Sequence, residues 1–496
     1  MTGRPRVVVV GGGLAGMAAA LACADGGAEV TLLEARPRLG GATFSFRRDG
    51  LWVDNGQHVF LRCCTAYRSF LRKIGSENHT FLQPRLSLPV IRPGGRVGRI
   101  ARNGFPPPLH LAIAMIRYPF LTPVERVRAA RAALALRHLD PSNPALDTRT
   151  FGSWLREQHQ SRNAVAALWD LIALPTLNLH AEEASLALAA KVFRTGLLDE
   201  RSAADVGYAT APLSQVHGAA GARALAEAGA TVHTRASARR LIPSDGGGFE
   251  VEGDGLRLAA DAVIAAVPHD RVLTLLPDGA LRQPVGQLGV SPIVNVHVVY
   301  DRKVTDLPVA AGLHSPVQWV FDRTAPSGLD RGQYLAVSVS GADREIGERT
   351  EALRAQFLPA IATMFPAARE ARVERFFVTR EPRATFRQVP GTGAFRPGPS
   401  TAVPGLFVAG AWTATGWPAT MEGAVRSGKA AAEHATAFVR LRSRDLERFA
   451  LEAAQSSVSP PIGRGIRGAQ ERGPERIALE AAEPSASPPI EGQVPV

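Results

Sequence analysis

Glycines recur near the start of the chain at a spacing that suits phosphate binding. The segment Gly11-Gly12-Gly13-Leu14-Ala15-Gly16 fits the pattern G-x-G-x-x-G. The first glycine permits a tight turn, the second lets the backbone approach a pyrophosphate, and the third lets a helix pack closely on a strand. Glu34, about 20 positions later, suits hydrogen bonds from ribose hydroxyls. We therefore expect a dinucleotide to be held by Gly11, Gly13, Leu14, Ala15, Gly16 and Glu34.

The elements around this loop are those that the motif requires. Residues 6–10 predict a buried strand, an alanine-rich helix is expected over about 14–26, and residues 28–34 predict the next strand. Together they form a strand–helix–strand unit in which the start of the helix faces the phosphates. This context favours dinucleotide binding over a glycine-rich turn of another α/β fold.

A glycine pair after Glu34 indicates which dinucleotide is held. The run Glu34-x3-Arg38-Leu39-Gly40-Gly41 resembles an element of the two-dinucleotide-binding flavoproteins, with one extra residue before the apolar position. In that element, paired glycines let the backbone pass beside the flavin phosphates and ribityl chain. The resemblance implies FAD rather than a nicotinamide cofactor, with further contacts from Ala35, Arg36, Gly40, Gly41, Ala42 and Thr43. Arg36 is expected to support the phosphates.

A second flavin element lies near the far end of the chain. Residues 405–411 predict a buried strand that ends in glycine, and a helix is expected over about 419–437. The run Thr415–Ala424 between them resembles the closing FAD motif of the amine oxidase and phytoene desaturase superfamily. There, backbone N–H groups at the helix start face the flavin N1/C2=O edge. The implied contacts are Val232, Gly410, Ala411, Ala419, Thr420, Met421 and Ala424, although Ala411 stands where the superfamily usually has an acid.

A more discriminating run lies between these two elements. It reads Asp54-Asn55-Gly56-Gln57-His58-Val59-Phe60, followed by Cys63-Cys64-Thr65-Ala66-Tyr67. With the flavin motifs, it resembles the squalene-associated FAD-dependent desaturases, the hydroxysqualene dehydroxylases of hopanoid biosynthesis, over about residues 5–435. The resemblance implies a long-chain isoprenoid substrate and a reductive reaction, in which hydroxysqualene and reduced flavin give squalene, water and oxidised flavin.

Such a reaction needs an acid for the departing hydroxyl and a dry apolar cavity. His58 is the candidate acid, because the unperturbed pKa of histidine lies near neutrality; its alternative role is a hydrogen bond to backbone near the flavin. Asp54 is the second candidate, with a loop-ordering role as its alternative. Trp412 and Trp417 are expected either to wall the cavity or to serve as ordinary core aromatics.

Composition bounds the remaining possibilities. The net charge is +12 and the pI about 10.5, but only four of the 57 basic residues are lysines, and the arginines are scattered rather than gathered in one run. The positive charge is therefore better explained by a general preference for arginine in this chain than by attraction to an anionic membrane. Nucleic acid is not expected as a partner. Three cysteines imply neither a disulfide framework nor a metal site, and suit a reduced compartment. The sequence shows no signal peptide and no apolar run long enough to span a membrane, so we expect a cytoplasmic enzyme. The segment 105–139 is apolar and contains several arginines, and its alternative roles are peripheral membrane contact and packing on the substrate domain.

The predicted fold is α/β, a Rossmann-type FAD-binding domain with an interleaved α+β substrate domain, as in the amine oxidase-like two-domain flavoproteins. The FAD-binding domain is expected to comprise 1–85, 215–275 and 395–438, and the substrate domain 86–214 and 276–394. Residues 440–496 predict a disordered low-complexity tail with short helical pieces. Rival functions are carotenoid-type desaturation or amine oxidation in the same fold, and non-catalytic prenyl-lipid carriage; the oligomeric state is left open.

Overall fold

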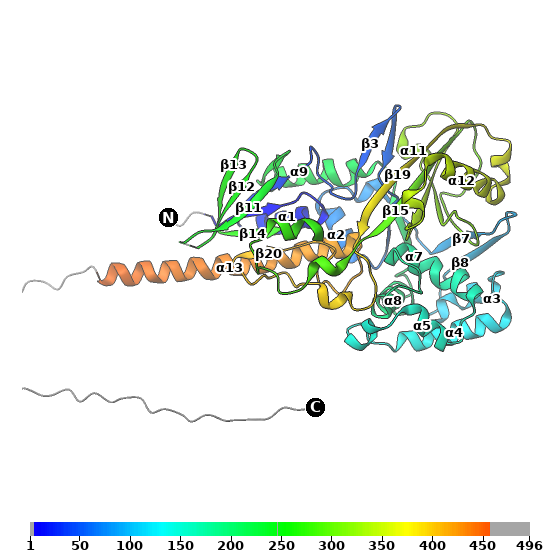
Figure 1. Ribbon diagram of the computed structural model, residues 1–496, viewed down its shortest axis with the longest axis horizontal. Coiled ribbons are helices and arrows are strands. Elements are labelled where there is room, and N and C mark those ends of the chain that lie inside the picture. The colour runs from blue at the N-terminus through cyan, green and yellow to red at the C-terminus, as the bar shows by residue number, and fades with distance from the viewer. Residues whose placement is uncertain (1–3, 246, 457–496) are drawn as a thin grey trace, which may run out of the picture. The chain divides into compact units, whose positions relative to one another are not determined.

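The computed structural model describes residues 4–245 and 247–456. Residues Met1–Arg444 form one compact unit, and the remaining residues form a second. Figure 1 displays the elements of the chain in sequence colours.

A five-stranded parallel sheet lies at the centre of the nucleotide-binding part. Its strand order is β10-β2-β1-β14-β20, the doubly wound order of dinucleotide-binding folds. The valine run of β1 is buried on both faces, because alternate side chains enter two different hydrophobic clusters. The strands are β10 (Thr231–Thr234), β2 (Glu29–Glu34), β1 (Arg6–Val10), β14 (Ala262–Ala265) and β20 (Leu406–Val408).

Helices cover one face of this sheet and a small antiparallel sheet covers the other. The helices are α1 (Leu14–Asp25), α9 (Ala220–Glu227) and the start of α13 (Met421–Ser456), whose apolar side chains share one cluster with β1 and β2. On the other face lie α10 (His269–Leu275) and the sheet formed by β11 (Ala238–Pro243), β12 (Phe249–Gly253) and β13 (Leu256–Ala260). This burial of both faces fixes the carboxyl ends of the strands, where the glycine segments lie.

A seven-stranded mixed sheet forms the second half of the unit. Its order is β19-β15-β18-β17-β16-β7-β8, and α12 (Thr350–Met364) packs on it through a third apolar cluster. The short α11 (Thr324–Ser327) precedes β18. The strands are β7 (Ser87–Ile91), β8 (Val97–Ala101), β15 (Ser291–Tyr300), β16 (Val309–Gly312), β17 (Trp319–Asp322), β18 (Gln333–Ser340) and β19 (Val373–Thr385).

Helices gather beside this sheet, drawn in cyan and green in Figure 1. They are α3 (Ala112–Arg117), α4 (Pro123–Arg137), α5 (Phe151–Glu157), α6 (Arg162–Ala164), α7 (Asp170–Leu177) and α8 (Leu186–Phe193). Thr122 caps α4 in a reciprocal capping box with Glu125. Smaller elements complete the unit: β3 (Ser45–Arg48), β4 (Leu51–Asp54), β5 (Val59–Leu61), β6 (Thr80–Leu82), β9 (Val206–Ala209) and α2 (Thr65–Lys73).

The strands of the two large sheets fall in the segments predicted for the FAD-binding and substrate domains, while the domain boundaries themselves stay a prediction. One expectation is wrong: the helix predicted to end near residue 437 continues as α13 to Ser456, into the predicted tail. Its alanine, leucine, arginine and glutamate residues are strong helix formers, and they continue the helix well past Ala424, the last predicted flavin contact. The rest of the predicted tail lies outside the described residues.

Candidate active site

The first glycine loop leaves β1 and enters α1 with each glycine in a distinct position. Gly11 has φ +110°, and its N–H donates to the Leu33 carbonyl at 2.7 Å. A Cβ on Gly16 would lie 1.8 Å from the Gly11 carbonyl oxygen, so Gly16 is required for helix–strand packing. A Cβ on Gly13 would meet only the Gly41 Cα, at 3.7 Å. The space beside Gly13 is therefore open, as a pyrophosphate path requires.

Glu34 ends β2 beneath this loop. Its carboxylate is buried and accepts hydrogen bonds from the backbone N–H groups of Gly12, at 2.6 Å, and of Arg36, at 2.8 Å. The two bonds fix the carboxylate beside the glycine loop, where a ribose would be held. Ala35 next to it is exposed, and Val232 lies on the neighbouring strand β10, opposite Leu32.

The glycine pair lies directly against the first loop. Gly40 and Gly41 have φ values of +105° and +55°, and a Cβ on Gly41 would lie 2.7 Å from the Gly13 Cα. Both the N–H and the hydroxyl of Thr43 donate to the Gly40 carbonyl, which closes the turn around Ala42. Two segments about 28 residues apart thus form one glycine-lined cradle, as the resemblance implies.

The guanidinium of Arg38 lies against this cradle. Its Nη1 donates to the Gly41 carbonyl at 3.1 Å, and its Cζ stacks 3.4 Å from the centroid of the Phe44 ring. The side chain of Arg36 is exposed instead. The phosphate-supporting role predicted for Arg36 stays a prediction, and Arg38 is the better placed of the two, because its position is fixed on both sides.

The closing segment returns to the cradle through α13. The N–H of Gly410 (φ +151°) donates to Ser427 Oγ at 2.8 Å, and a Cβ on Gly428 would lie 2.0 Å from the Ala15 carbonyl oxygen. The backbones of α13 and α1 therefore touch beside the first glycine loop. Thr420, Met421 and Ala424 form the start of α13, where the Ala424 N–H donates to the Thr420 carbonyl, and Ala419 donates its N–H to Gln388.

Arg396 holds the segment that precedes α13, and the sequence analysis missed it. Its guanidinium donates to the carbonyls of Ala411, Trp412, Thr413 and Trp417. Burial lowers the pKa of Arg396 to about 10, so the group stays charged at neutral pH. A cation that binds four carbonyls fixes the loop even though Ala411 replaces the acid usual at this position.

The run that suggested the family packs against the same helix. Glu422, on the first turn of α13, is buried and accepts hydrogen bonds from the N–H groups of Ala66 and Tyr67, at 3.1 and 2.7 Å. It thereby caps α2, and Arg426 pairs with it at 2.7 Å. Sequence reasoning missed this contact as well; its only signal was an acid in the first turn of a predicted helix. The contact joins the two most informative motifs.

Asp54 ends β4 in a buried ion pair. One carboxylate oxygen accepts from Ser45 Oγ at 2.6 Å and from the Leu213 N–H at 3.1 Å, and the other accepts from Arg323 Nη2 at 2.6 Å. Both partners of the pair are less than one-tenth exposed. These contacts favour the structural alternative for Asp54, because the carboxylate is fixed by protein groups on every side.

His58 follows β4 at the edge of the same region. Burial lowers its pKa to about 4, against a smaller opposing effect of Asp54, so the ring is neutral at neutral pH. It is therefore a neutral ring that can offer a hydrogen bond, rather than a charged acid. His217 lies close by, and burial, with His58 nearby, lowers its pKa to about 3. Catalysis by His58 stays a prediction.

The two tryptophans occupy different surroundings. Trp412 is buried in an apolar cluster on the sheet, and its indole N–H donates to the Val267 carbonyl at 2.9 Å. Trp417 is half-buried between two cations, with Lys191 Nζ 5.2 Å and Arg426 Cζ 5.1 Å from its ring centroid. Trp412 thus has the contacts of a core aromatic, and Trp417 remains the candidate for a cavity wall.

Flavin fits this arrangement on two structural grounds. In the cradle, the space beside Gly13 is open where a side chain would otherwise project. In addition, His58 Nε2 and Gln57 Nε2 are buried with no hydrogen-bond partner among the described residues, and such groups ordinarily have one. No cluster of three or more potential metal-ligating side chains occurs within 4–245 and 247–456.

Comparisons with known proteins agree with this site. The family model described as "Flavin containing amine oxidoreductase" matches residues 14–436. Hydroxysqualene dehydroxylase of Rhodopseudomonas palustris is 31% identical, over 86% of this chain and 97% of that protein. Zeta-carotene desaturase of Zea mays is 25% identical, over 86% and 83%. The solved cyclohexylamine oxidase of Brevibacterium oxydans superposes with a TM-score of 0.67 at 20% identity, covering 88% of this chain and all of that one.

Fold and site therefore define a flavin-dependent oxidoreductase with a two-domain, amine oxidase-like architecture. The chain belongs to the flavin-containing amine oxidoreductase family, and FAD is its cofactor.

Proposed function

We propose that the chain reduces hydroxysqualene to squalene with FAD as the hydride carrier. The observation that carries the proposal is its likeness to hydroxysqualene dehydroxylase, 31% identical over nearly the whole of that protein, against 25% for the zeta-carotene desaturase. The run from Asp54 to Tyr67 adds support, because it is tied by Glu422 to the helix that closes the flavin site.

The residues present would hold the cofactor as follows. The cradle of Gly13 and Gly41 would take the pyrophosphate, Glu34 the ribose, and the start of α13 the flavin ring edge. Bound and reduced, FAD supplies a hydride.

The chain's own groups must promote loss of the allylic hydroxyl. The neutral imidazole of His58, with a pKa lowered to about 4 by burial, can donate a hydrogen bond through Nε2, which has no protein partner among the described residues. Such a bond weakens the carbon–oxygen bond without an ion in the cavity. Overall, the carbon–oxygen bond would break, hydride supplied by reduced flavin would form the new carbon–hydrogen bond, and the hydroxyl would leave as water after taking the one proton that oxidation of FADH2 releases.

The second candidate is a carotene-type desaturation, and the likeness to zeta-carotene desaturase favours it. The two reactions run in opposite redox directions, which makes them separable. Enzyme with reduced FAD should convert hydroxysqualene to squalene without oxygen, as measured by gas chromatography with mass spectrometry. Enzyme with oxidised FAD should leave phytoene and zeta-carotene unchanged when a quinone acceptor is present. Desaturated carotene without any squalene would overturn the proposal in favour of the second candidate.

A further inference from the structure

Exposed apolar side chains are concentrated on one part of this protein. Among the residues that the structure describes, eleven large apolar side chains are exposed, and eight of them fall between residues 97 and 134. Their exposed fractions range from 40 to 68%. We call these eight side chains, together with the exposed arginines Arg117, Arg128 and Arg131, the α3–α4 surface. The eight are Val97, Phe105, Leu109, Ile113, Ile116, Val124, Val127 and Leu134.

Five of these eight side chains lie on the solvent-facing sides of the neighbouring helices α3 and α4. On α4 the exposed residues Val124, Val127 and Leu134 recur three and seven positions apart, which is one helical face. The opposite face, with Ala129 and Leu136, is buried. On α3 the exposed apolar residues are Ile113 and Ile116, and α3 adjoins α4 in the structure (Figure 1). The outward apolar side chains of both helices therefore remain largely open to solvent.

Positive charge is concentrated in the same segment. Residues 86–139 contain nine arginines and one acid, a net charge of +8, whereas the whole chain carries +12. The arginines of the chain form no continuous basic run, so the sequence analysis described them as scattered. The excess of positive charge becomes apparent when the charges are summed over residues 86–139. The one acid, Glu125, is engaged in the capping box of α4. Arg117, Arg128 and Arg131 are exposed beside the apolar residues and have no acidic partner within 4–245 and 247–456.

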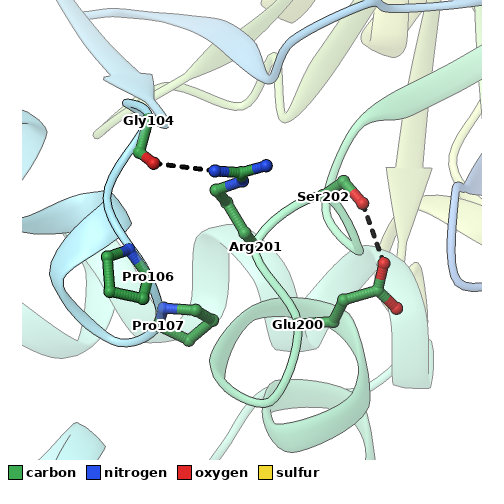
Figure 2. A pocket seen from close by; sticks show the side chains of 6 residues that line it. All are labelled: Gly104, Pro106, Pro107, Glu200, Arg201 and Ser202. Atoms are coloured by element: carbon green, nitrogen blue, oxygen red, sulfur yellow. Dashed lines mark hydrogen bonds between the residues drawn. The ribbon is translucent and has the colours of Figure 1, made fainter.

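A hollow adjoins this surface at the loop that carries Phe105. Figure 2 shows its lining, in which Gly104, Pro106 and Pro107 face residues 200–202. Its volume is about 320 Å³, and Arg201 bridges it by donating to the Gly104 carbonyl at 2.8 Å. The hollow is separate from the flavin motifs and adds another exposed guanidinium beside Phe105.

We propose that the α3–α4 surface docks on an anionic lipid bilayer, with its apolar side chains inserted and its arginines at the headgroups. A helix that combines an outward apolar face with arginines is typical of interfacial binding. A nucleic acid would satisfy the charge but not the apolar residues. Within 4–245 and 247–456, no helix has the length and hydropathy needed to span a bilayer. This inference holds whichever isoprenoid reaction the chain catalyses.

The test is co-sedimentation of the full FAD-loaded chain with vesicles of phosphatidylcholine, alone or mixed with phosphatidylglycerol. We expect at least about tenfold tighter binding to the anionic vesicles, weakened by added salt. The double variants Ile116→Glu/Val127→Glu and Arg128→Glu/Arg131→Glu should each lose at least about tenfold. Leu273→Glu, at an equally exposed apolar residue on α10, is the matched control and should bind like the parent chain.

All the altered side chains are exposed, so each variant should fold. Flavin content and melting temperature check this. Equal binding of the parent chain and both double variants would overturn the proposal, as would equal binding to neutral and anionic vesicles. Light scattering supplies a further check. A parent dimer that Ile116→Glu/Val127→Glu converts to monomer, without any vesicle binding by the parent, would identify the surface as an interface between two copies and overturn the proposal.

Discussion

Substitution of Gly13 by valine should weaken FAD binding strongly while it lowers the stability of the fold only slightly. A Cβ at this position would have one neighbour, the Gly41 Cα at 3.7 Å, and the backbone already has φ −77° and ψ −177°, which any residue adopts. Valine should therefore be accepted by the fold at a cost of about 1 kcal/mol, the usual loss for replacing glycine at a helix N-cap. Its methyl groups would project about 1.5 Å further, into the expected pyrophosphate path.

The loss of affinity can be estimated from the phosphate contacts. Each charge-assisted hydrogen bond between a backbone N–H and a phosphate contributes about 1.5–3 kcal/mol. If valine displaces the pyrophosphate from two of them, binding weakens by about 3–6 kcal/mol, or at least about 100-fold in Kd. Gly13→Val should therefore purify folded and colourless.

Gly16→Ala is the informative contrast. Its Cβ would lie 1.8 Å from a backbone oxygen, so α1 must move off β1. We expect this variant to lose about 1–3 kcal/mol of stability, and to lose flavin only as a consequence. Gly347→Ala, where no atom lies within 4 Å of the added Cβ, should resemble the parent chain in both respects.

The assay combines the flavin absorbance of each purified variant, FAD titration calorimetry of the apoprotein, and thermal unfolding. A Gly13→Val variant that keeps FAD with parent-like affinity would refute the assignment of the cradle. A large fall in the melting temperature of apo Gly13→Val would refute the claim that the space beside Gly13 is reserved for ligand.

Three further predictions follow from other contacts. Arg396→Met should lower both the melting temperature and the flavin content, because four carbonyls in buried or part-buried positions lose their donor, and Arg396→Lys should restore part of each. Parent-like flavin content in Arg396→Met would contradict the role of Arg396 in holding this segment. Since the pKa of the buried His217 is lowered to about 3, the unfolded chain binds its proton first as pH falls below about 6.5, so this residue should cost about 2 kcal/mol of stability at pH 5 relative to pH 8. Urea unfolding of His217→Gln should show a pH dependence smaller by that amount, and an unchanged dependence would contradict the shift. Deleting 457–496 should leave flavin content and melting temperature unchanged, because the predicted flavin contacts end at Ala424, whereas deleting 441–496 should lower the melting temperature, because Arg442 lies against Gly247.

Local sequence predicted those parts of the site that a short segment can encode. The valine run of β1 and the G-x-G-x-x-G turn depend on neighbours within a few residues, and the structure has each of them where it was expected. The resemblance to the flavoproteins singled out the Gly40–Gly41 pair, and the structure places Gly41 directly against Gly13.

Contacts between distant segments had no such local signal. Glu422 caps a helix 355 positions earlier, and Gly428 is needed only because Ala15 approaches it. Arg396 precedes the closing motif and belongs to no spacing pattern. The end of α13 was misjudged for a different reason: composition suggested a tail, while the same residues have high helix propensity.

A single-turnover experiment tests the central claim most directly. The enzyme is loaded with FAD, reduced without oxygen and mixed with hydroxysqualene, while flavin absorbance near 450 nm (roughly the maximum of an oxidised flavin) is followed and squalene is measured. Our account predicts that absorbance returns and that one squalene forms for each flavin reoxidised, with neither change in Gly13→Val. Flavin that stays reduced in the presence of hydroxysqualene, with no squalene formed, would contradict it.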